Sequence, residues 1–351
     1  MCVDAEPTRR SAPEGVTVKN ARLTTLLVLV LALTLATTAA SASGRGDGSR
    51  AQITGHDGVV YEQAPDAVPG FEDELFFGAE FDYACAVGPR FVSTLDAIAK
   101  LARIIERSGR RAVWTLGYAK TTVKPEDIDR STLPHGKCDR TGLKIYRNAA
   151  RKYDDPNYLP LADLLASSSH QTYFKTDAHW SSVGGSVFAK ALATELDPRL
   201  GARQRYRYGT EQWNGMLNEM RGIHDPETAE TAFPEVKVRV RTAPGSDPYD
   251  GYPGGVYDHS WTSSPAKRTY PGHTLILGDS FSMLALENLR PLFRHGRWIW
   301  HFQSRLGRVV DAIVDADTVV IEAYQLYTPG LSFTQPSFLR KLRHALDRDQ
   351  D

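Results

Sequence analysis

The sequence predicts an α/β domain of three layers, in which helices cover both faces of a mainly parallel sheet. Apolar, strand-like segments alternate with amphipathic, helix-like segments from about residue 71, and the same alternation resumes after an irregular stretch. No internal repeat or heptad pattern occurs. A content of 41% hydrophobic and 24% charged residues is typical of an ordinary globular protein with a substantial core.

Side-chain spacing defines the elements of the first half of the domain. Apolar residues recur at helical spacing over 91–108, and the apolar run at 112–117 indicates a buried strand after a basic turn. A short helix is expected at 160–169, an extended segment at 172–175, and an amphipathic helix at 182–196 that begins at serine caps. A helix therefore leads into a sheet strand, as a layered α/β fold requires.

The second half begins with a stretch of different composition. Residues 200–270 are rich in Gly, Pro, Tyr and Asp around one alternating strand at 236–242, so we expect an insertion or a long surface excursion. Strand and helix patterns then resume, at 274–277, 282–293, 298–302 and 318–321. This return of the alternation indicates that both halves contribute to one sheet.

An uncharged, strongly apolar segment lies near the N-terminus, at 23–43. It predicts a membrane-inserting element, and the basic residues before it keep residues 1–22 in the cytoplasm and send the remaining chain outside. The segment is either an uncleaved, single-pass signal anchor or a signal peptide cleaved after the small residues at 40–42, which would release a secreted protein. Residues 44–70 are expected to be a linker to an extracytoplasmic domain at 71–351.

Export changes the interpretation of the cysteines. Cys85 and Cys138 would share an oxidising compartment, where a disulfide persists, so we expect a bridge between them. Two separate buried thiols are the alternative, because spacing alone does not show that the two Cα atoms approach each other.

A first candidate for chemistry is the string Gly-Asp-Ser-Phe at 278–281, between an apolar strand and a helix. This position places Ser280 at the carboxyl end of a sheet strand and at a helix N-terminus, where backbone N–H groups can stabilise an oxyanion. Taken alone, the string fits a plain helix cap as well as a nucleophile.

A second candidate is the string Lys-Thr-Asp-Ala-His-Trp at 175–180. A serine hydroxyl needs a base, and histidine serves as one when a carboxylate fixes its tautomer. Asp177 and His179 have a spacing that permits contact in a bent loop. The same pair also fits an ordinary strand end, where both side chains satisfy local backbone groups.

Together the two strings resemble the paired signatures of the alginate O-acetyltransferase family, the AlgX/AlgJ-like proteins with an SGNH-hydrolase-like domain. The resemblance is carried by 173–185 and 275–281, with weaker similarity at 75–78 and 115–128. It extends over about residues 71–330 and implies the SGNH-hydrolase-like three-layer fold.

The resemblance also implies a Ser-His-Asp triad. Ser280 would be the nucleophile, His179 the general base and acid, and Asp177 the residue that orients His179. Ordinary SGNH hydrolases carry the serine block first, whereas here His179 precedes Ser280, so the order of the motifs is permuted, as in this family. Triads are defined by geometry and not by chain order.

The implied activity is an extracytoplasmic O-acetyltransferase that needs no cofactor. It would move an acetyl group through a serine acyl-enzyme to hydroxyls of a cell-surface or secreted polysaccharide. The resemblance further implies a membrane partner of the MBOAT type as acetyl donor. A carbohydrate acetylesterase with the same triad, or a non-catalytic polysaccharide-binding or assembly protein, are the alternatives.

The oxyanion hole has no obvious second member. The strand at 318–321 is not followed by the Gly-x-Asn-Asp block of SGNH hydrolases. We expect the Ser280 N–H to be one donor and Tyr324 or Gln325 to be another, although both also fit plain strand termination. Asp279 is a further candidate for oxyanion or substrate binding.

Several aromatic side chains are candidate sugar contacts. Trp180, beside His179, either forms the floor of a sugar groove or is a packing wedge that holds the loop. The irregular stretch contributes further candidates: Trp213, Tyr249, Tyr252 and Trp261.

Other classes of site are not indicated. The histidines lack metal-binding spacing, and the glycine-rich segments lack the strand–loop–helix context of nucleotide sites. A formal net charge of zero and a pI near 7.2 exclude a broad basic surface for nucleic acid or anionic lipid.

Overall fold

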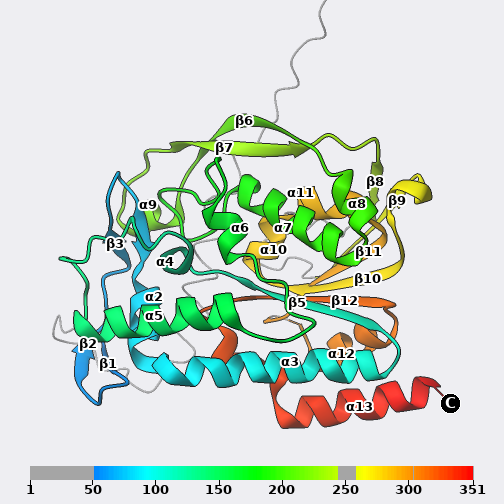
Figure 1. The fold of residues 1–351 in the computed structure, drawn as a ribbon, viewed down its shortest axis with the longest axis horizontal. Coiled ribbons are helices and arrows are strands. Elements are labelled where there is room, and N and C mark those ends of the chain that lie inside the picture. Colours follow the sequence, from blue (N-terminus) through cyan, green and yellow to red (C-terminus); the bar gives the residue numbers. More distant parts are fainter. Residues whose placement is uncertain (1–50, 244–257, 303, 351) are drawn as a thin grey trace, which may run out of the picture.

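The computed structural model describes residues 51–243, 258–302 and 304–350, and its centre is a six-stranded sheet (Figure 1). The strand order is β5-β12-β10-β11-β9-β8. The bounds of these strands are β5 Arg111–Gly117, β12 Thr318–Tyr324, β10 Tyr270–Gly278, β11 Phe293–Trp300, β9 Asp258–Ser264 and β8 Arg239–Thr242. The first four run parallel, and β9 pairs antiparallel with both β11 and β8.

Helices cover both faces of this sheet (Figure 1). One layer holds α3 (Phe91–Arg107), α12 (Leu306–Val314) and α13 (Pro336–Gln350), and the other holds α7 (Ser182–Leu196) with shorter helices around it. The predicted three-layer α/β class with a mainly parallel sheet is therefore confirmed.

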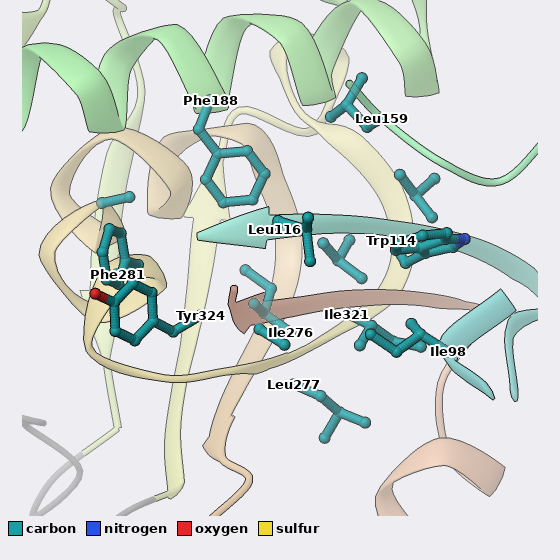
Figure 2. Packing of buried hydrophobic residues seen from close by; sticks show 14 of the residues in the cluster. Ile98, Trp114, Leu116, Leu159, Phe188, Ile276, Leu277, Phe281, Ile321 and Tyr324 are labelled. Atoms are coloured by element: carbon teal, nitrogen blue, oxygen red, sulfur yellow. The ribbon is translucent and has the colours of Figure 1, made fainter. Parts of the chain in front are cut away.

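The core lies between the sheet and the two helical layers. Strand β12 is buried at every position, which explains why its sequence is a continuous apolar run and not an alternating one. Figure 2 shows Phe188 of α7 and Ile98 of α3 among the strand residues Leu116, Ile276 and Ile321. The central sheet is therefore packed on both faces, and this packing fixes the positions of the carboxyl ends of its strands.

Shorter elements surround the central layers. The remaining helices are α2 (Gly78–Val87), α4 (Lys120–Val123), α5 (Lys137–Lys152), α6 (Ala162–Ala166), α8 (Pro198–Ala202), α9 (Met216–Met220), α10 (Ser280–Leu284) and α11 (Leu286–Leu289). Three antiparallel pairs lie outside the main sheet: β1 (Gln52–Thr54) with β2 (Val60–Glu62), β3 (Ala67–Pro69) with β4 (Leu75–Phe77), and β6 (Tyr206–Trp213) with β7 (Glu227–Pro234).

The expectation of a linker at 44–70 is wrong for residues 51–70, which are the part of it that the structure describes. Strands β1, β2 and β3 lie within it, and backbone bonds attach it to the domain. The His56 N–H donates to the Cys85 carbonyl (2.8 Å), and the Gly78 N–H donates to the Asp66 carbonyl (2.9 Å). Short strands of this kind have little periodicity of their own, because contacts with the rest of the domain define them.

The stretch at 200–270 is not a plain surface excursion either. Strands β8 and β9 extend the central sheet, and the β6–β7 hairpin packs on α7, where the Ala232 N–H donates to Ser182 Oγ (2.7 Å). Two boundaries also differ: the helix expected at 282–293 is divided into α10, α11 and a 3₁₀ turn, and β11 begins five residues before the expected 298.

Cys85 of α2 and Cys138 of α5 form the expected disulfide, with a Cα–Cα distance of 5.0 Å. Gly55 lies against the bridge, because a Cβ at this position would come within 2.9 Å of both sulfur atoms. The disulfide therefore joins two helices under the N-terminal β1–β2 pair.

The apolar segment at 23–43 lies outside the described residues. Within the ranges that the structure describes, no helix combines the length and the hydropathy needed to cross a membrane.

Candidate active site

Ser280 is the first residue of α10, directly beyond the carboxyl end of β10. The strand ends at Gly278, where a Cβ would lie 1.8 Å from Ser282 Oγ, so the close turn requires glycine. Asp279 caps the helix, since its Oδ1 accepts the Phe281 N–H (3.0 Å). The turn presents Ser280 at the edge of the sheet.

The N–H groups that follow Ser280 in the first turn of α10 are already paired. The Phe281 N–H donates to Asp279 Oδ1, and the Ser282 N–H donates to Glu322 Oε2 (3.1 Å). Among the described residues, none accepts a hydrogen bond from the Ser280 N–H. The N–H of Ser280, the candidate nucleophile, is therefore free to donate to a negatively charged oxygen.

His179 connects Ser280 to Asp177. The Ser280 hydroxyl lies 2.8 Å from His179 Nε2, and His179 Nδ1 lies 2.7 Å from Asp177 Oδ1. The His179 N–H also donates to Asp177 Oδ1 (3.1 Å), a contact that the two-residue spacing permits. Ser280, His179 and Asp177 are 4%, 2% and 1% exposed, so water has little access to their contacts.

Local structure bends the loop that carries Asp177 and His179. Tyr173 and Trp180 pair as an isolated antiparallel bridge on either side of it. Ser181 then caps α7, because its Oγ accepts the Val183 N–H (3.2 Å). The loop is therefore fixed at both ends, with both functional side chains on its inner side.

The second carboxylate oxygen of Asp177 is held by the β6–β7 hairpin. Trp213 Nε1 and the Met216 N–H donate to Asp177 Oδ2, at 3.1 and 3.0 Å. Burial by itself raises the pKa of Asp177, but the charge of His179 and the bonds from His179 and Met216 outweigh it and lower the pKa. Asp177 is therefore ionised and aligned toward His179.

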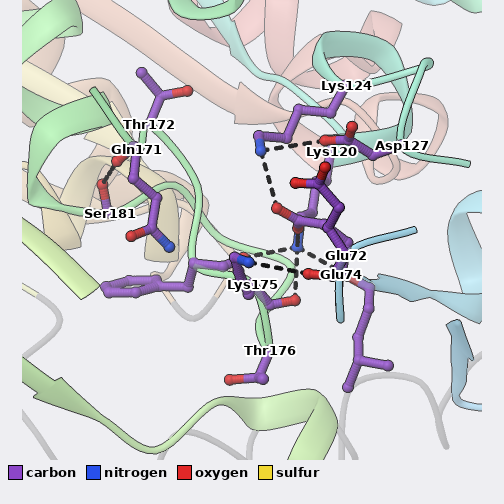
Figure 3. A network of polar contacts seen from close by, with 12 residues as sticks. Glu72, Glu74, Lys120, Lys124, Asp127, Gln171, Thr172, Lys175, Thr176 and Ser181 are labelled. Carbon is purple, nitrogen blue, oxygen red and sulfur yellow. Dashed lines mark hydrogen bonds and ion pairs between the residues drawn. The ribbon is translucent and has the colours of Figure 1, made fainter. Parts of the chain in front are cut away.

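Lys120, the first residue of α4, supports the same loop from its other side. Its ammonium group donates to the carbonyl oxygens of Leu75 (2.9 Å), Phe174 (2.7 Å) and Lys175 (2.8 Å). Glu74 Oε2 lies 2.5 Å from it, and the side chain of Lys120 has no exposed surface. Figure 3 shows the ammonium group at the centre of this network, which ties the loop to β4.

Lys120→Met is expected to lower the free energy of unfolding by about 3 kcal/mol, because it removes the ammonium donor from three carbonyl groups and leaves the buried Glu74 carboxylate with Lys124 as its remaining cation. Urea denaturation measures the loss. Lys100→Met, on the exposed side of α3, is the matched control and should stay near wild type. Equal midpoints for the two variants would contradict this role of Lys120.

Glu322 of β12 lies buried beside the turn at 278–282 that carries Ser280. Its Oε2 accepts the N–H groups of Asp279 and Ser282, both at 3.1 Å. Burial, and then the charge of Asp279, raise the pKa of Glu322 well above its usual range. In the folded protein this side chain therefore keeps its proton to higher pH than a free glutamate does.

Glu322→Gln is expected to weaken the loss of stability with rising pH. The folded protein keeps the Glu322 proton at pH values where the unfolded chain releases it, that is, above about pH 4.3. As the pH rises from there to the pKa of Glu322 in the folded protein, this group lowers the free energy of unfolding of wild type by at most about 1.4 kcal/mol per pH unit. Glutamine does not titrate, so Tm measured between about pH 5 and pH 8 should fall less in the variant. Exposed Glu106→Gln is the control, and a wild-type slope in Glu322→Gln would refute the assignment.

The structure separates the candidates for the second oxyanion donor. The Tyr324 hydroxyl donates to Glu80 Oε1 (2.9 Å) and is therefore engaged. Gln325 Oε1 accepts the Ala119 N–H (3.1 Å), which orients the amide, and its Nε2 has no acceptor among the described residues. Gln325 is thus the better of the two candidates.

Asp279 and Trp180 are buried and form hydrogen bonds with backbone groups around Ser280. The oxygens of Asp279 accept the N–H groups of Phe281 (3.0 Å) and Tyr324 (2.6 Å), so this carboxylate fixes the turn and is not an oxyanion donor. Trp180 has no exposed surface, and its Nε1 donates to the Phe281 carbonyl (2.8 Å). Its role is therefore that of a packing wedge, and the groove-floor alternative is wrong.

The other aromatic candidates occupy different places. Trp261 is buried against Gly296, whose Cβ would lie 2.1 Å from the indole ring, so it too is a packing residue. Trp213 is half-buried and stacks on Phe174, with ring centroids 4.2 Å apart. Tyr249 and Tyr252 lie outside the described residues.

One group with potential metal-ligating atoms occurs in the described residues: Cys85, His135 and Asp139. Its atoms have other partners, since Cys85 is in the disulfide and His135 Nδ1 lies 2.8 Å from Asp139 Oδ1. Burial opposes the charge on His135, but Asp139 and Asp82 outweigh it and raise its pKa to about 10. This group is therefore a buried ion-pair cluster that joins α2 and α5.

The chain is similar to a known protein family over part of its length. Residues 67–251 match the family model described as the SGNH hydrolase-like domain of acetyltransferase AlgX. No curated protein matches the chain. Ser280 lies beyond the matched segment, so its place in the site follows from its contacts with His179.

The solved structures that are similar to the chain include the three that follow. The O-acetyltransferase domain of Pseudomonas putida AlgJ is 19% identical, with a TM-score of 0.49 over 80% of this chain and 99% of that one. Bacillus cereus PatB1 is 12% identical, with a TM-score of 0.52 over 75% and 96% of the two chains. Pseudomonas aeruginosa AlgX is 14% identical, with a TM-score of 0.44 over 80% and 66%.

The family match extends over more than half of the 351 residues and includes the loop with Asp177 and His179. The structural similarity to PatB1 supports the same fold. The chain therefore belongs to the AlgX family of acetyltransferases with an SGNH hydrolase-like domain.

Proposed function

We propose that this protein is an O-acetyltransferase that acts through an acyl-enzyme on Ser280 and transfers acetyl groups to hydroxyls of a cell-surface or secreted polysaccharide. The observation that carries the proposal is the continuous set of hydrogen bonds from Asp177 through His179 to Ser280, in a member of an acetyltransferase family.

In the first half-reaction, Ser280 Oγ attacks the carbonyl carbon of the acetyl donor while its proton passes to His179 Nε2. The negative charge of the tetrahedral intermediate lies on the former carbonyl oxygen, where the Ser280 N–H donates and Gln325 Nε2 is the candidate second donor. Asp177 stabilises the imidazolium. When the intermediate collapses, the leaving group takes the proton from His179 and acetyl-Ser280 remains.

In the second half-reaction, a sugar hydroxyl takes the place of the leaving group. His179 accepts the hydroxyl proton as the sugar oxygen attacks the acetyl carbon, and Ser280 Oγ then leaves and recovers the proton from His179. The products are the acetylated sugar and the free enzyme. Every proton is passed by His179, so no cofactor is needed.

We also propose that the domain works outside the cytoplasm, attached to the membrane by the segment at 23–43 or released after cleavage. The disulfide between Cys85 and Cys138 supports this location, because such bonds persist in oxidising compartments. Acetyl-CoA is a cytoplasmic metabolite, so the proposal includes a membrane partner of the MBOAT type that supplies the acetyl group.

A carbohydrate acetylesterase is the second candidate, because water can attack the same acetyl-Ser280. Ser280 and His179 are only 4% and 2% exposed. This burial favours transfer to a sugar, which displaces water from the site, and disfavours hydrolysis of the acetyl-enzyme. A non-catalytic polysaccharide-binding or assembly protein would not need the aligned hydrogen bonds of the triad.

Incubation with a chromogenic acetyl ester, with and without candidate oligosaccharides, tests the proposal. Mass spectrometry follows the acetyl group, and acetylated oligosaccharide is the expected product. Acetate released to water whatever sugar is added would support the esterase instead. Turnover equal in wild type and Ser280→Ala would contradict both enzymes.

A further inference from the structure

The β6–β7 hairpin, with the α9 turn between its strands, donates two hydrogen bonds to Asp177. Trp213 ends β6 and Met216 begins α9, and both donate to Asp177 Oδ2. Asp177 Oδ1 faces His179 Nδ1, so each carboxylate oxygen has its own donors. The carboxylate can rotate only if it breaks bonds on both sides.

Further bonds tie the hairpin to the loop that carries Asp177. The Leu217 N–H donates to the Thr176 carbonyl (3.1 Å), and Glu227 Oε2 accepts the Lys175 N–H (2.8 Å). Gly215 lies directly on Thr176, since a Cβ would come within 2.1 Å of the Thr176 carbonyl oxygen. The hairpin and the loop therefore behave as one packed unit.

The indole of Trp213 is itself held in place. Its ring stacks on Phe174 with an interplanar angle of 4° and a centroid distance of 4.2 Å. Phe174 belongs to the loop that Lys120 fixes, through the bond from the ammonium group to the Phe174 carbonyl (2.7 Å). This stacking fixes the direction in which Nε1 points.

We propose that Trp213 is a positioning residue, which holds the Asp177 carboxylate in the orientation that His179 needs, and that the hairpin at 206–234 is part of the catalytic unit. The inference rests on the proposed function, because the step that it supports is proton transfer from Ser280 to His179. By donating to Oδ2, Trp213 also draws negative charge away from Oδ1.

Other charged groups lie around Asp177. Glu219 of α9 and Glu227 of β7 interact with it electrostatically, and burial raises the pKa of both carboxyls. Lys120 Nζ lies 3.4 Å from the Asp177 carbonyl oxygen. These groups are present in wild type and in a Trp213 variant alike, so a difference between the two pH profiles reports the lost donor.

Trp213→Phe tests the proposal, because phenylalanine keeps a ring over Phe174 and removes only the donor. In the full-length protein, kcat for acetyl-ester turnover should fall about 10-fold with little change in KM, as for other lost bonds to a charged group. The acid limb of the kcat/KM profile should move to higher pH, because a more negative Asp177 lets His179 keep its proton.

Trp261→Phe is the matched control, since it removes an indole donor to the Arg290 carbonyl (2.9 Å) away from the triad. Its kcat and pH profile should equal wild type. Unchanged kcat and an unmoved acid limb in Trp213→Phe would overturn the proposal. A fall in kcat that matches a loss of Tm, with no shift of the acid limb, would also overturn it, because it would indicate a structural role.

A titration of the His179 ring by NMR separates this inference from the proposed function, because it needs no turnover. A shift to higher pH in Trp213→Phe, absent in Trp261→Phe, would support positioning. If Ser280→Ala keeps full activity, the proposed function fails, and the His179 titration still decides whether Trp213 acts on the Asp177–His179 pair.

Discussion

Ser280→Ala is expected to abolish acetyl transfer and acetyl-ester hydrolysis while the fold remains intact. The variant removes the atom that would carry the acetyl group, so the rate should fall by at least about 10⁴-fold. The hydroxyl makes one hydrogen bond to a side chain, to His179 Nε2 at 2.8 Å, so its removal should change the free energy of unfolding by only about 1 kcal/mol.

Initial rates with a chromogenic acetyl ester, together with thermal unfolding curves, measure both effects. Ser332→Ala, at an exposed position outside the site, is the matched control and should keep the wild-type rate. A Ser280→Ala protein with a tenth or more of the wild-type rate would exclude Ser280 as the nucleophile, whatever the effect on stability.

Asp177→Asn should have the second-largest effect, a fall in kcat of about 10⁴-fold by analogy with the serine-protease triad. Asparagine has one oxygen and one amide nitrogen. If the amide nitrogen faces Trp213 and Met216, their N–H groups lose their acceptor and meet another donor. If it faces His179, it donates to Nδ1 and the imidazole is held in the wrong tautomer. Neither orientation restores the bonds that the carboxylate makes.

Steady-state kinetics of Asp177→Asn, alone and combined with Ser280→Ala, measure this dependence. Because the triad residues act as a unit, the double variant should be no slower than Ser280→Ala. Asp154→Asn, at an exposed position, is the control. A rate for Asp177→Asn within 10-fold of wild type would show that His179 does not depend on this carboxylate.

The sequence was sufficient to predict the layers of the fold and to single out Asp177, His179 and Ser280, which the structure brings into contact. A continuous apolar run marks the fully buried strand β12, and serine caps before a helical pattern mark α7. Asp177 and His179 are neighbours in a recognisable string, and Ser280 lies at a strand-to-helix junction. These are local signals, which the chain carries in a few adjacent residues.

The supports of the triad could not be predicted in this way. Trp213 and Lys120 reach the Asp177 loop from 36 and 57 positions away in the chain, and only the packed fold brings them there. The close contact of Gly215 with Thr176 likewise appears only in the packed fold. The composition of the stretch, rich in turn-forming residues, indicated a surface excursion instead.

Burial is another property that local patterns do not report. A tryptophan beside a candidate histidine fits both a sugar platform and a wedge, and only the complete packing shows that Trp180 has no exposed surface. Helix α5 was missed because charged residues dominate it and Gly142, Tyr146 and Ala150 form only a narrow buried stripe. Helix α13 was also missed, although its buried Leu342 and Leu346 lie at helical spacing.

Peptide mapping by mass spectrometry after acid quenching is the most direct test of the acyl-enzyme. The purified protein is mixed briefly with an acetyl ester, quenched and digested. We expect one acetyl group on the peptide that contains Ser280, and a larger acetylated fraction in Asp177→Asn if deacylation slows more than acylation. Acetylation at another residue, or turnover that continues in Ser280→Ala, would contradict an acyl-enzyme on Ser280.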